Sequence, residues 1–190
     1  MKIRKPLLRT SRRASPKLVV SLVMGIFVSF CASAGLASGN NKVGDFALLD
    51  QSGKFHQLSY YGDFKAVVIS AQGLSGSGLA EDAATLSAVK SAVGKQGVKF
   101  FILNPQPADA RDAVAAKAGD LNLDIAILLD QSQLVAETLG LTRLGESVIV
   151  NAENMSVLYR GDTSSIAQVL PGLLTQDGVA VASAQPSGKL

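Results

Sequence analysis

Short apolar runs that alternate with stretches of helical spacing are the feature of this sequence that most constrains its fold. Residues 66–71, 98–103 and 125–129 have the length and composition typical of buried strands. Between the first two runs, apolar side chains fall on one stripe of a helix over residues 79–93, at Leu79, Ala83, Leu86, Val89 and Val93. Strands that alternate with helices predict an α/β fold, in which a central sheet is covered on both faces.

Two hairpins and three further helices are predicted besides these elements. The hairpins pair residues 46–49 with 55–58 and 147–150 with 156–159, and the helices cover residues 108–118, 131–139 and 166–174. Pro171 is expected to split or kink the last helix. The sequence therefore predicts one domain over residues 41–174, followed by a flexible tail over residues 175–190, which are small, polar and glycine-containing.

The first 34 residues have the three-part composition of a signal peptide. Residues 2–17 carry seven basic side chains and no acidic one, residues 18–30 are almost wholly apolar, and Ala32-Ser33-Ala34 fits a small-residue cleavage site. We therefore expect residues 1–34 to be removed and the rest to be exported to the periplasm, with no stable membrane insertion. The alternative is an uncleaved N-terminal anchor, because residues 18–36 approach the roughly 20 residues that a membrane-spanning helix needs.

Loss of this leader would change the sign of the net charge. The whole chain has 18 basic and 15 acidic side chains, and seven of the basic ones belong to residues 1–34, which leaves 11 against 15 and a net charge of −4. Nucleic-acid binding normally requires a basic surface. The composition of the remaining domain therefore argues against a nucleic-acid partner.

Cys31 is the only cysteine, and it lies inside the predicted leader. A thiolate is the attacking group both in thiol-disulfide exchange and in peroxide reduction, so a domain without cysteine can carry out neither reaction. The exported, secreted domain is therefore expected to be cysteine-less and to have no disulfide within the monomer.

Several stretches resemble the redoxin branch of the thioredoxin superfamily, which holds the peroxiredoxins and their thiol-disulfide relatives. These stretches are residues 43–50 (VGDFALLD), 97–104 (GVKFFILN), 127–130 (ILLD) and 157–161 (VLYRG), and they follow the order of the family. The resemblance covers roughly residues 43–174. It implies a thioredoxin-like fold, with a central mixed β-sheet flanked by helices on both faces.

The chain departs from the redoxin pattern where that family carries out its chemistry. Redoxins carry the attacking cysteine, commonly followed by proline, in the loop after the strand that corresponds to residues 66–71. Gly76 and Ser77 correspond to those two positions here, and Leu144-Gly145 stands where relatives have a Thr-Pro-type pair. The resemblance therefore implies a pseudoenzyme with no catalytic residue and a degenerate site at Ser75, Gly76, Ser77 and Gly145.

We expect a protein-binding groove to persist without the cysteine, because contacts to an extended backbone need no sulfur. Thioredoxin-like proteins recognise partners through loops at the carboxyl ends of their strands, so the resemblance implies a noncatalytic binding or assembly factor for another periplasmic protein. For Arg143 and Arg160 we expect surface or ion-paired positions rather than an acidic ligand. The residues predicted to line the groove are Gln72, Gly73, Leu74, Ser75, Gly76, Ser77, Asn104, Gln106, Arg143, Leu144, Gly145 and Glu146.

Two other functions stay open. One is residual thiol-disulfide oxidoreductase or peroxidase-type antioxidant activity, as the family resemblance implies. The other is binding of a small anion by residues 73–78, since free N–H groups at a helix start attract anions, although Glu81 and Asp82 already place negative charge there. No cofactor and no metal site is predicted, because the only histidine, His56, is expected to be a solvated or capping side chain.

Overall fold

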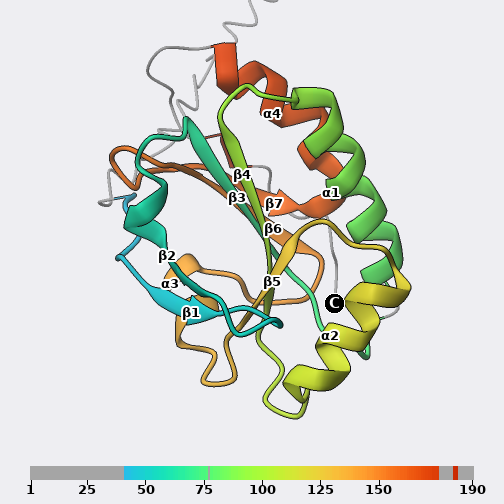
Figure 1. Cartoon of the computed structure of the whole chain (residues 1–190). Helices are drawn as coiled ribbons and strands as arrows, with labels where there is room; N and C mark the ends of the chain where they lie inside the picture. Colours follow the sequence, from blue (N-terminus) through green and yellow to red (C-terminus); the bar gives the residue numbers. More distant parts are fainter. Residues whose placement is uncertain (1–40, 77, 176–181, 184–190) are drawn as a thin grey trace, which may run out of the picture. The chain divides into compact units, whose positions relative to one another are not determined.

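The central sheet has six strands in the order β5-β4-β3-β6-β7-β8 (Figure 1). This computed structural model describes residues 41–76, 78–175 and 182–183. β3, β4 and β5 run parallel, β6 is antiparallel to β3, β7 is antiparallel to β6, and β8 is parallel to β7. The sheet is therefore mixed, as predicted. Its strands are β3 (Ala66–Ala71), β4 (Val98–Asn104), β5 (Ala126–Leu129), β6 (Glu146–Asn151), β7 (Val157–Asp162) and β8 (Ala182–Ser183).

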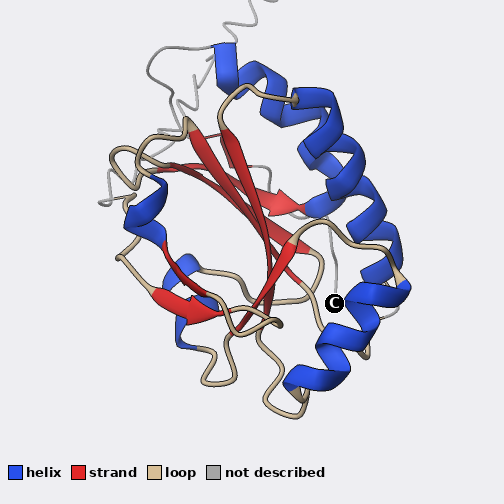
Figure 2. Ribbon diagram, in the orientation of Figure 1, coloured by secondary structure: helices blue, strands red, loops and turns tan. Residues whose placement is uncertain are grey.

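Helices cover one face of this sheet, and a hairpin with a short helix covers the other (Figures 1 and 2). The first face carries α1 (Leu79–Val93), α2 (Arg111–Asp120) and α4 (Ile166–Thr175). The second face carries the hairpin of β1 (Ala47–Leu49) and β2 (Phe55–Gln57), the 3₁₀ turn Leu58–Tyr61 and α3 (Leu134–Leu139). The α/β class and the covering of both faces are therefore as predicted.

The central strand β3 is buried along its whole length. Val68 packs into the core beneath α1 and α4, while Val67 and Ile69 pack on the opposite face with Phe101 of β4. A strand covered on both faces is apolar at most positions instead of at alternate positions. This is why β3 is apolar in the sequence except at Ser70.

The register of β3 and β4 places the carboxyl ends of both strands at the same end of the sheet. Their pairing runs from Ala66 opposite Val98 to Ala71 opposite Leu103. The backbone N–H of Gln72 then donates to Leu103 O at 2.8 Å. The two loops that follow β3 and β4 therefore leave the sheet side by side.

Both predicted hairpins are present. β1 and β2 pair with Leu48 opposite His56, and the turn between them reaches the edge strand β5, where the N–H of Gln51 donates to Ile127 O at 3.1 Å. The second hairpin, β6 with β7, is longer than predicted and contains a register shift between Ile149 and Val150. The first hairpin therefore covers an edge of the sheet as well as its face.

Two helices begin three residues later than predicted. α2 begins at Arg111, because the Asp109 carboxylate accepts a hydrogen bond from the N–H of Leu74 at 2.8 Å and Ala110 is extended. α3 begins at Leu134, because Gln133 has a φ of 62°. The first residue of α2 is determined by a side chain that binds distant backbone, and that of α3 by a residue in the left-handed conformation. Helical periodicity in the sequence indicates neither.

α4 is a continuous helix that contains Pro171, so the prediction of a split is wrong. Ile166, Leu170 and Leu173 of this helix are buried against the sheet. Packing of an apolar face supplies most of the stability of a protein helix, and it outweighs the hydrogen bond that the proline removes.

The predicted leader, residues 1–34, lies outside the described residues. Of the range predicted as a tail, Thr175 ends α4 and Ala182–Ser183 form β8, while residues 176–181 and 184–190 also lie outside the described residues. Within the part of the chain that the structure describes, no helix combines the length and the apolar character needed to cross a membrane.

Candidate functional site

The segments predicted to form the site meet at the carboxyl ends of β3 and β4. Gln72 follows β3, Asn104 ends β4, and Gly145 precedes β6. The N–H of Gly145 donates to Ala71 O at 2.8 Å, which ties the loop before β6 to the end of β3. The structure thus brings together three loops that are far apart in the sequence.

Hydrogen bonds hold the glycine loop that follows β3. The N–H of Gly76 donates to Gly73 O at 3.1 Å, and the Asp109 carboxylate accepts from the N–H of Leu74 and from Asn104 Nδ2, at 2.8 and 2.9 Å. Ser75 is exposed, while Ser77 lies outside the described residues. Asp109 is therefore a support of this loop that the sequence did not identify.

The glycine loop excludes a side chain at Gly73 and leaves little room for one at Gly76. A β-carbon added at Gly73 would lie 2.6 Å from Cγ of Gln106, and one at Gly76 would lie 3.2 Å from Gly73 O and 3.5 Å from Cδ1 of Leu144. Real β-carbons essentially never approach another heavy atom within 3.0 Å. The side chain of Gln106 therefore excludes a side chain at Gly73, and Gly76 is tightly packed.

The loop before β6 is organised by Glu146, which is 8% exposed. One of its carboxylate oxygens, Oε2, accepts from the N–H of Thr142 at 2.7 Å and from the N–H of Arg143 at 3.2 Å. Nε of Arg143 lies 3.3 Å from the other oxygen, and Nη2 of Arg143 pairs with Asp162. The hydrogen bond with Asp162 raises the pKa of Arg143 above its usual value. Arg143 is therefore ion-paired, as expected.

A buried hydroxyl cluster supports the same loop from below. Oγ1 of Thr163 donates to Gly145 O at 2.9 Å, and the Oγ atoms of Ser70 and Ser147 lie 2.7 and 2.8 Å from Thr163 Oγ1. Because a threonine hydroxyl has one proton, both serines must donate to it. The cluster fixes Gly145, whose φ is +84°, between β3 and β7.

Gln72 and Asp82 form a second polar contact beneath the glycine loop. Gln72 is 2% exposed, and its Nε2 donates to the Asp82 carboxylate. Burial raises the pKa of Asp82 above its usual value, and the charges of Glu81 and Asp162 raise it further, against the lowering effect of the hydrogen bond from Gln72. This negative charge at the start of α1 disfavours an anion at residues 73–78.

A cavity of about 440 Å³ opens beside these loops. It is lined by Ala71 at the end of β3, by Gln106, by Gln133 and Glu137 around α3, and by Arg143 and Leu144. Of the predicted groove residues, Gln106, Arg143 and Leu144 line it, whereas Gln72 and Asn104 are 2% exposed and act as supports. The contribution of α3 was not predicted, and we name this cavity the α3 groove.

His56 is buried, so the expectation that it is solvated or a cap is wrong. It is 4% exposed, its Nε2 lies 2.8 Å from Oδ2 of Asp50, and its Nδ1 lies 2.6 Å from Oη of Tyr61. Burial by itself would raise the pKa of Asp50, but hydrogen bonds from Ser52, His56 and Lys54 outweigh it and lower that pKa to about 2. The three side chains Asp50, His56 and Tyr61 form what we name the hairpin network.

Among the described residues, no three histidine, cysteine, aspartate or glutamate side chains come together in a way that could hold a metal ion. Arg160 donates from Nε to Leu139 O at 3.0 Å, so it also has a partner within the chain.

No protein-family model and no curated protein matches this chain. Solved structures do match it. A putative thiol:disulfide interchange protein DsbE from Chlorobium tepidum is 14% identical, with a TM-score of 0.62, over 70% of this chain and 96% of that one. Peroxidoxin BcpB from Mycobacterium tuberculosis is 18% identical, with a TM-score of 0.60, over 70% and 93%.

A third similar structure is a secreted disulfide oxidoreductase of Mycobacterium tuberculosis, which is 17% identical, with a TM-score of 0.55, over 68% of this chain and 93% of that one. At these identities the similarity is one of fold. The central mixed sheet and the covering of both its faces agree with it. This chain therefore has a thioredoxin-like fold, and the described residues that form it contain no cysteine.

Proposed function

We propose that this chain is a noncatalytic, exported redoxin-like protein that binds an extended segment of another periplasmic protein in the α3 groove. The observation that carries the proposal is an open groove beside a tightly packed glycine loop. The groove has a volume of about 440 Å³, while a β-carbon at Gly73 of the loop would lie 2.6 Å from Cγ of Gln106.

The chemistry of the described residues favours binding over catalysis. No cysteine follows Cys31 in the sequence, so the residual-activity alternative lacks its attacking thiolate. A serine nucleophile would need a neighbouring base, and both ring nitrogens of the only histidine are engaged by Asp50 and Tyr61. Ser75 is therefore an exposed loop residue without an available histidine.

The groove combines features that suit a peptide segment. Apolar side chains such as Leu144 lie beside the amides of Gln106 and Gln133, which can bond to a peptide backbone. The walls are held in place by the hydrogen bonds to Asp109 and Glu146. A groove with fixed walls loses little conformational entropy when it binds, and this favours affinity.

The experiment is site-specific photo-crosslinking in cells that express the tagged full-length protein. A photoreactive amino acid at Gln106 should capture a companion protein, and the same amino acid at Glu153 should not. The substitution Leu144→Asp, in the lining of the groove, should abolish the capture. Leu49→Asp, at a hairpin position that is 48% exposed, is the matched control and should leave it intact.

Thermal unfolding of each variant shows whether the substitution has merely unfolded the domain. A companion captured equally from Gln106 and Glu153 contradicts the groove as the binding site. Capture that survives Leu144→Asp in a folded protein contradicts it as well.

A further inference from the structure

We propose that the segment bound in the α3 groove is basic, with a lysine or arginine side chain placed beside Glu137. This inference rests on the proposed function and specifies the partner that the same groove takes. It is argued from the shape of the groove and from the charges around it.

The groove lies among more carboxylates than cations. Glu137 is exposed and lines the groove, and Asp82, Glu146 and Asp162 lie around the loop before β6. The cations that adjoin the groove are Arg143 and Arg160. Over these six side chains, all ionised, the net charge is −2.

The two arginines are already occupied. Arg143 is shared by two carboxylates, since its Nε lies 3.3 Å from Glu146 and its Nη2 pairs with Asp162. Arg160 donates to Leu139 O, and its guanidinium packs against Gly140. An acidic segment would therefore have to compete with Glu146 and Asp162 for Arg143. Glu137 is free to pair with a cation, because no partner of its side chain is found among the described residues.

The local field has the same sign. The charges of Glu81 and Asp162 contribute to the raised pKa of Asp82, so a further negative charge is disfavoured beneath the glycine loop. Charge complementarity sets which partners approach an interface and which are rejected. The excess of negative charge near the groove therefore favours a positively charged segment.

The shape of the groove also suits a long basic side chain. Its walls include Ala136, Leu141 and Leu144, and Glu137 lies on the same lining. Lysine and arginine bury an apolar stem and keep the charged head near a polar partner. The apolar wall and the carboxylate match these two parts.

The test uses short leucine- and alanine-containing peptides that are identical except for lysine, glutamine or glutamate at the central position. Each peptide is titrated into the ¹⁵N-labelled full-length protein while the amide signals of Glu137, Gly140 and Arg143 are followed. The lysine peptide should bind about two- to fivefold more tightly than the glutamine peptide, and this difference should shrink at high salt. The glutamate peptide should bind most weakly.

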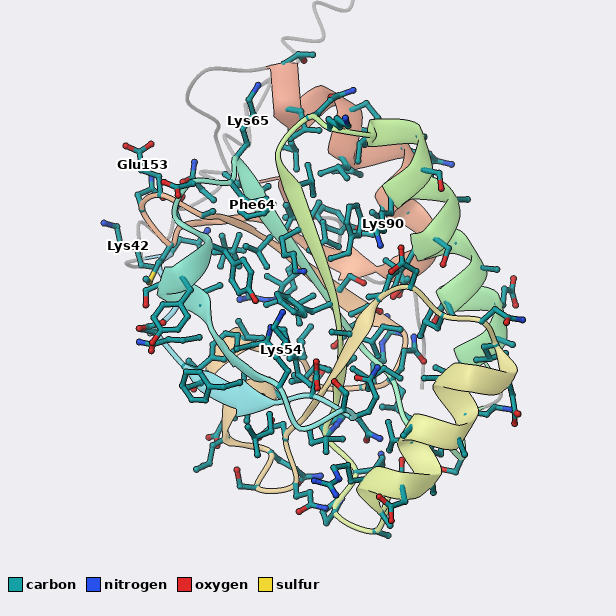
Figure 3. The ribbon with its side chains drawn as sticks, in the orientation of Figure 1. Lys42, Lys54, Phe64, Lys65, Lys90 and Glu153 are labelled. Atoms are coloured by element: carbon teal, nitrogen blue, oxygen red, sulfur yellow. The ribbon has the colours of Figure 1, made fainter. Side chains whose placement is uncertain are left out.

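Glu137→Gln should remove that two- to fivefold preference for lysine. The matched control is Glu153→Gln. Figure 3 shows Glu153 beside Lys65, the residue before β3, at the end of the sheet opposite the groove. The six residues of β3 span roughly 20 Å, which exceeds the screening length of about 8 Å at physiological salt. The control should keep the full preference.

The outcomes separate the two proposals. Equal binding of all three peptides, with groove amides shifted, would leave a binding groove but overturn a basic partner. Tightest binding of the glutamate peptide would overturn it in favour of an acidic partner of Arg143. If no peptide shifts the groove amides, both this inference and the peptide groove itself are contradicted.

Discussion

Two carboxylates, one on each of the elements that cover the two faces of the central sheet, have pKa values shifted in opposite directions. Asp50, in the hairpin network, has its pKa lowered to about 2, because hydrogen bonds from Ser52, His56 and Lys54 outweigh its burial. Asp82, beneath the glycine loop, has its pKa raised by burial and by the charges of Glu81 and Asp162. The fold thus favours ionisation of the first carboxylate and opposes ionisation of the second.

The difference separates a hydrogen-bonded network that stabilises the folded domain from the region of the candidate site. Hydrogen-bond donors surround the carboxylate of Asp50. The ring of Phe101 packs against His56, with ring centroids 5.1 Å apart. Around Asp82, the neighbours are glycines and further carboxylates. Groups whose ionisation the fold opposes cluster at functional sites. The raised pKa of Asp82 is therefore in keeping with a candidate site at the glycine loop.

The largest expected effect is that of removing the carboxylate from the hairpin network. Asp50→Ala leaves His56 Nε2 and the N–H groups of Ser52 and Lys54 without their acceptor. Breaking a buried polar pair from one side is strongly destabilising, so the free energy of unfolding should fall by about 3 kcal/mol. Urea unfolding at neutral pH measures it. Asp63→Ala, at an exposed position, should change it by less than about 0.5 kcal/mol. If both substitutions lowered the free energy of unfolding equally, the hairpin network would have no special part in stability.

The pH dependence of stability should show the same network. The folded pKa of Asp50, about 2, lies below its usual value of 3.8, so its contribution is fully present above pH 3.8 and is lost as the pH falls towards 2. The loss amounts to about 2 kcal/mol. Urea unfolding of the wild type and Asp50→Asn between these two pH values should give curves that converge. Parallel curves would show that Asp50 is not stabilised as an anion.

A methyl group at the glycine loop should have a smaller effect. Gly73→Ala places a β-carbon 2.6 Å from Cγ of Gln106, and crowding of this kind costs about 1–3 kcal/mol. The double variant with Gln106→Ala should recover most of the loss. Gly119→Ala, in α2 where nothing lies within 4 Å, should instead stabilise by about 0.4–1 kcal/mol. Thermal unfolding shows whether each substitution stabilises or destabilises the domain. A loss of stability in Gly73→Ala that Gln106→Ala does not relieve would contradict the crowding of Gly73 by Gln106.

The smallest expected effect has the opposite sign. The folded pKa of Asp82 is raised, so at neutral pH its ionised form opposes folding, and that cost disappears as the pH falls through the raised pKa. Asp82→Asn keeps an acceptor for Gln72 without the charge, so its urea midpoint at neutral pH should exceed that of the wild type. A lower midpoint would show that the ionised Asp82 stabilises the loop.

The sequence was a good guide where burial alone determines structure. The six residues of β3 and the fifteen of α1 have the predicted bounds. β3 is apolar except at Ser70, and α1 has a regular apolar stripe. The starts of α2 and α3 were misplaced, because they depend on Asp109, which binds the loop after β3, and on the left-handed Gln133. Such long-range side-chain bonds leave no periodic signal.

The site was predictable in position but not in composition. The order of strands placed the three loops at one end of the sheet, yet α3 supplies Gln133 and Glu137 to the groove, and a short helix gives no sign of the surface that it faces. His56 did carry a usable signal. It lies two residues before Leu58, so alternation along the chain puts both side chains on the buried face.

The central claim is that this domain has a thioredoxin-like fold but no thiol-dependent activity. The most direct test is to measure the catalytic turnover of the purified Cys31→Ser protein. Insulin reduction with dithiothreitol and peroxide consumption with a thiol donor are measured beside the wild type. Because no other cysteine exists, both proteins should show only the uncatalysed rate. Sustained turnover by the Cys31→Ser protein would contradict the account.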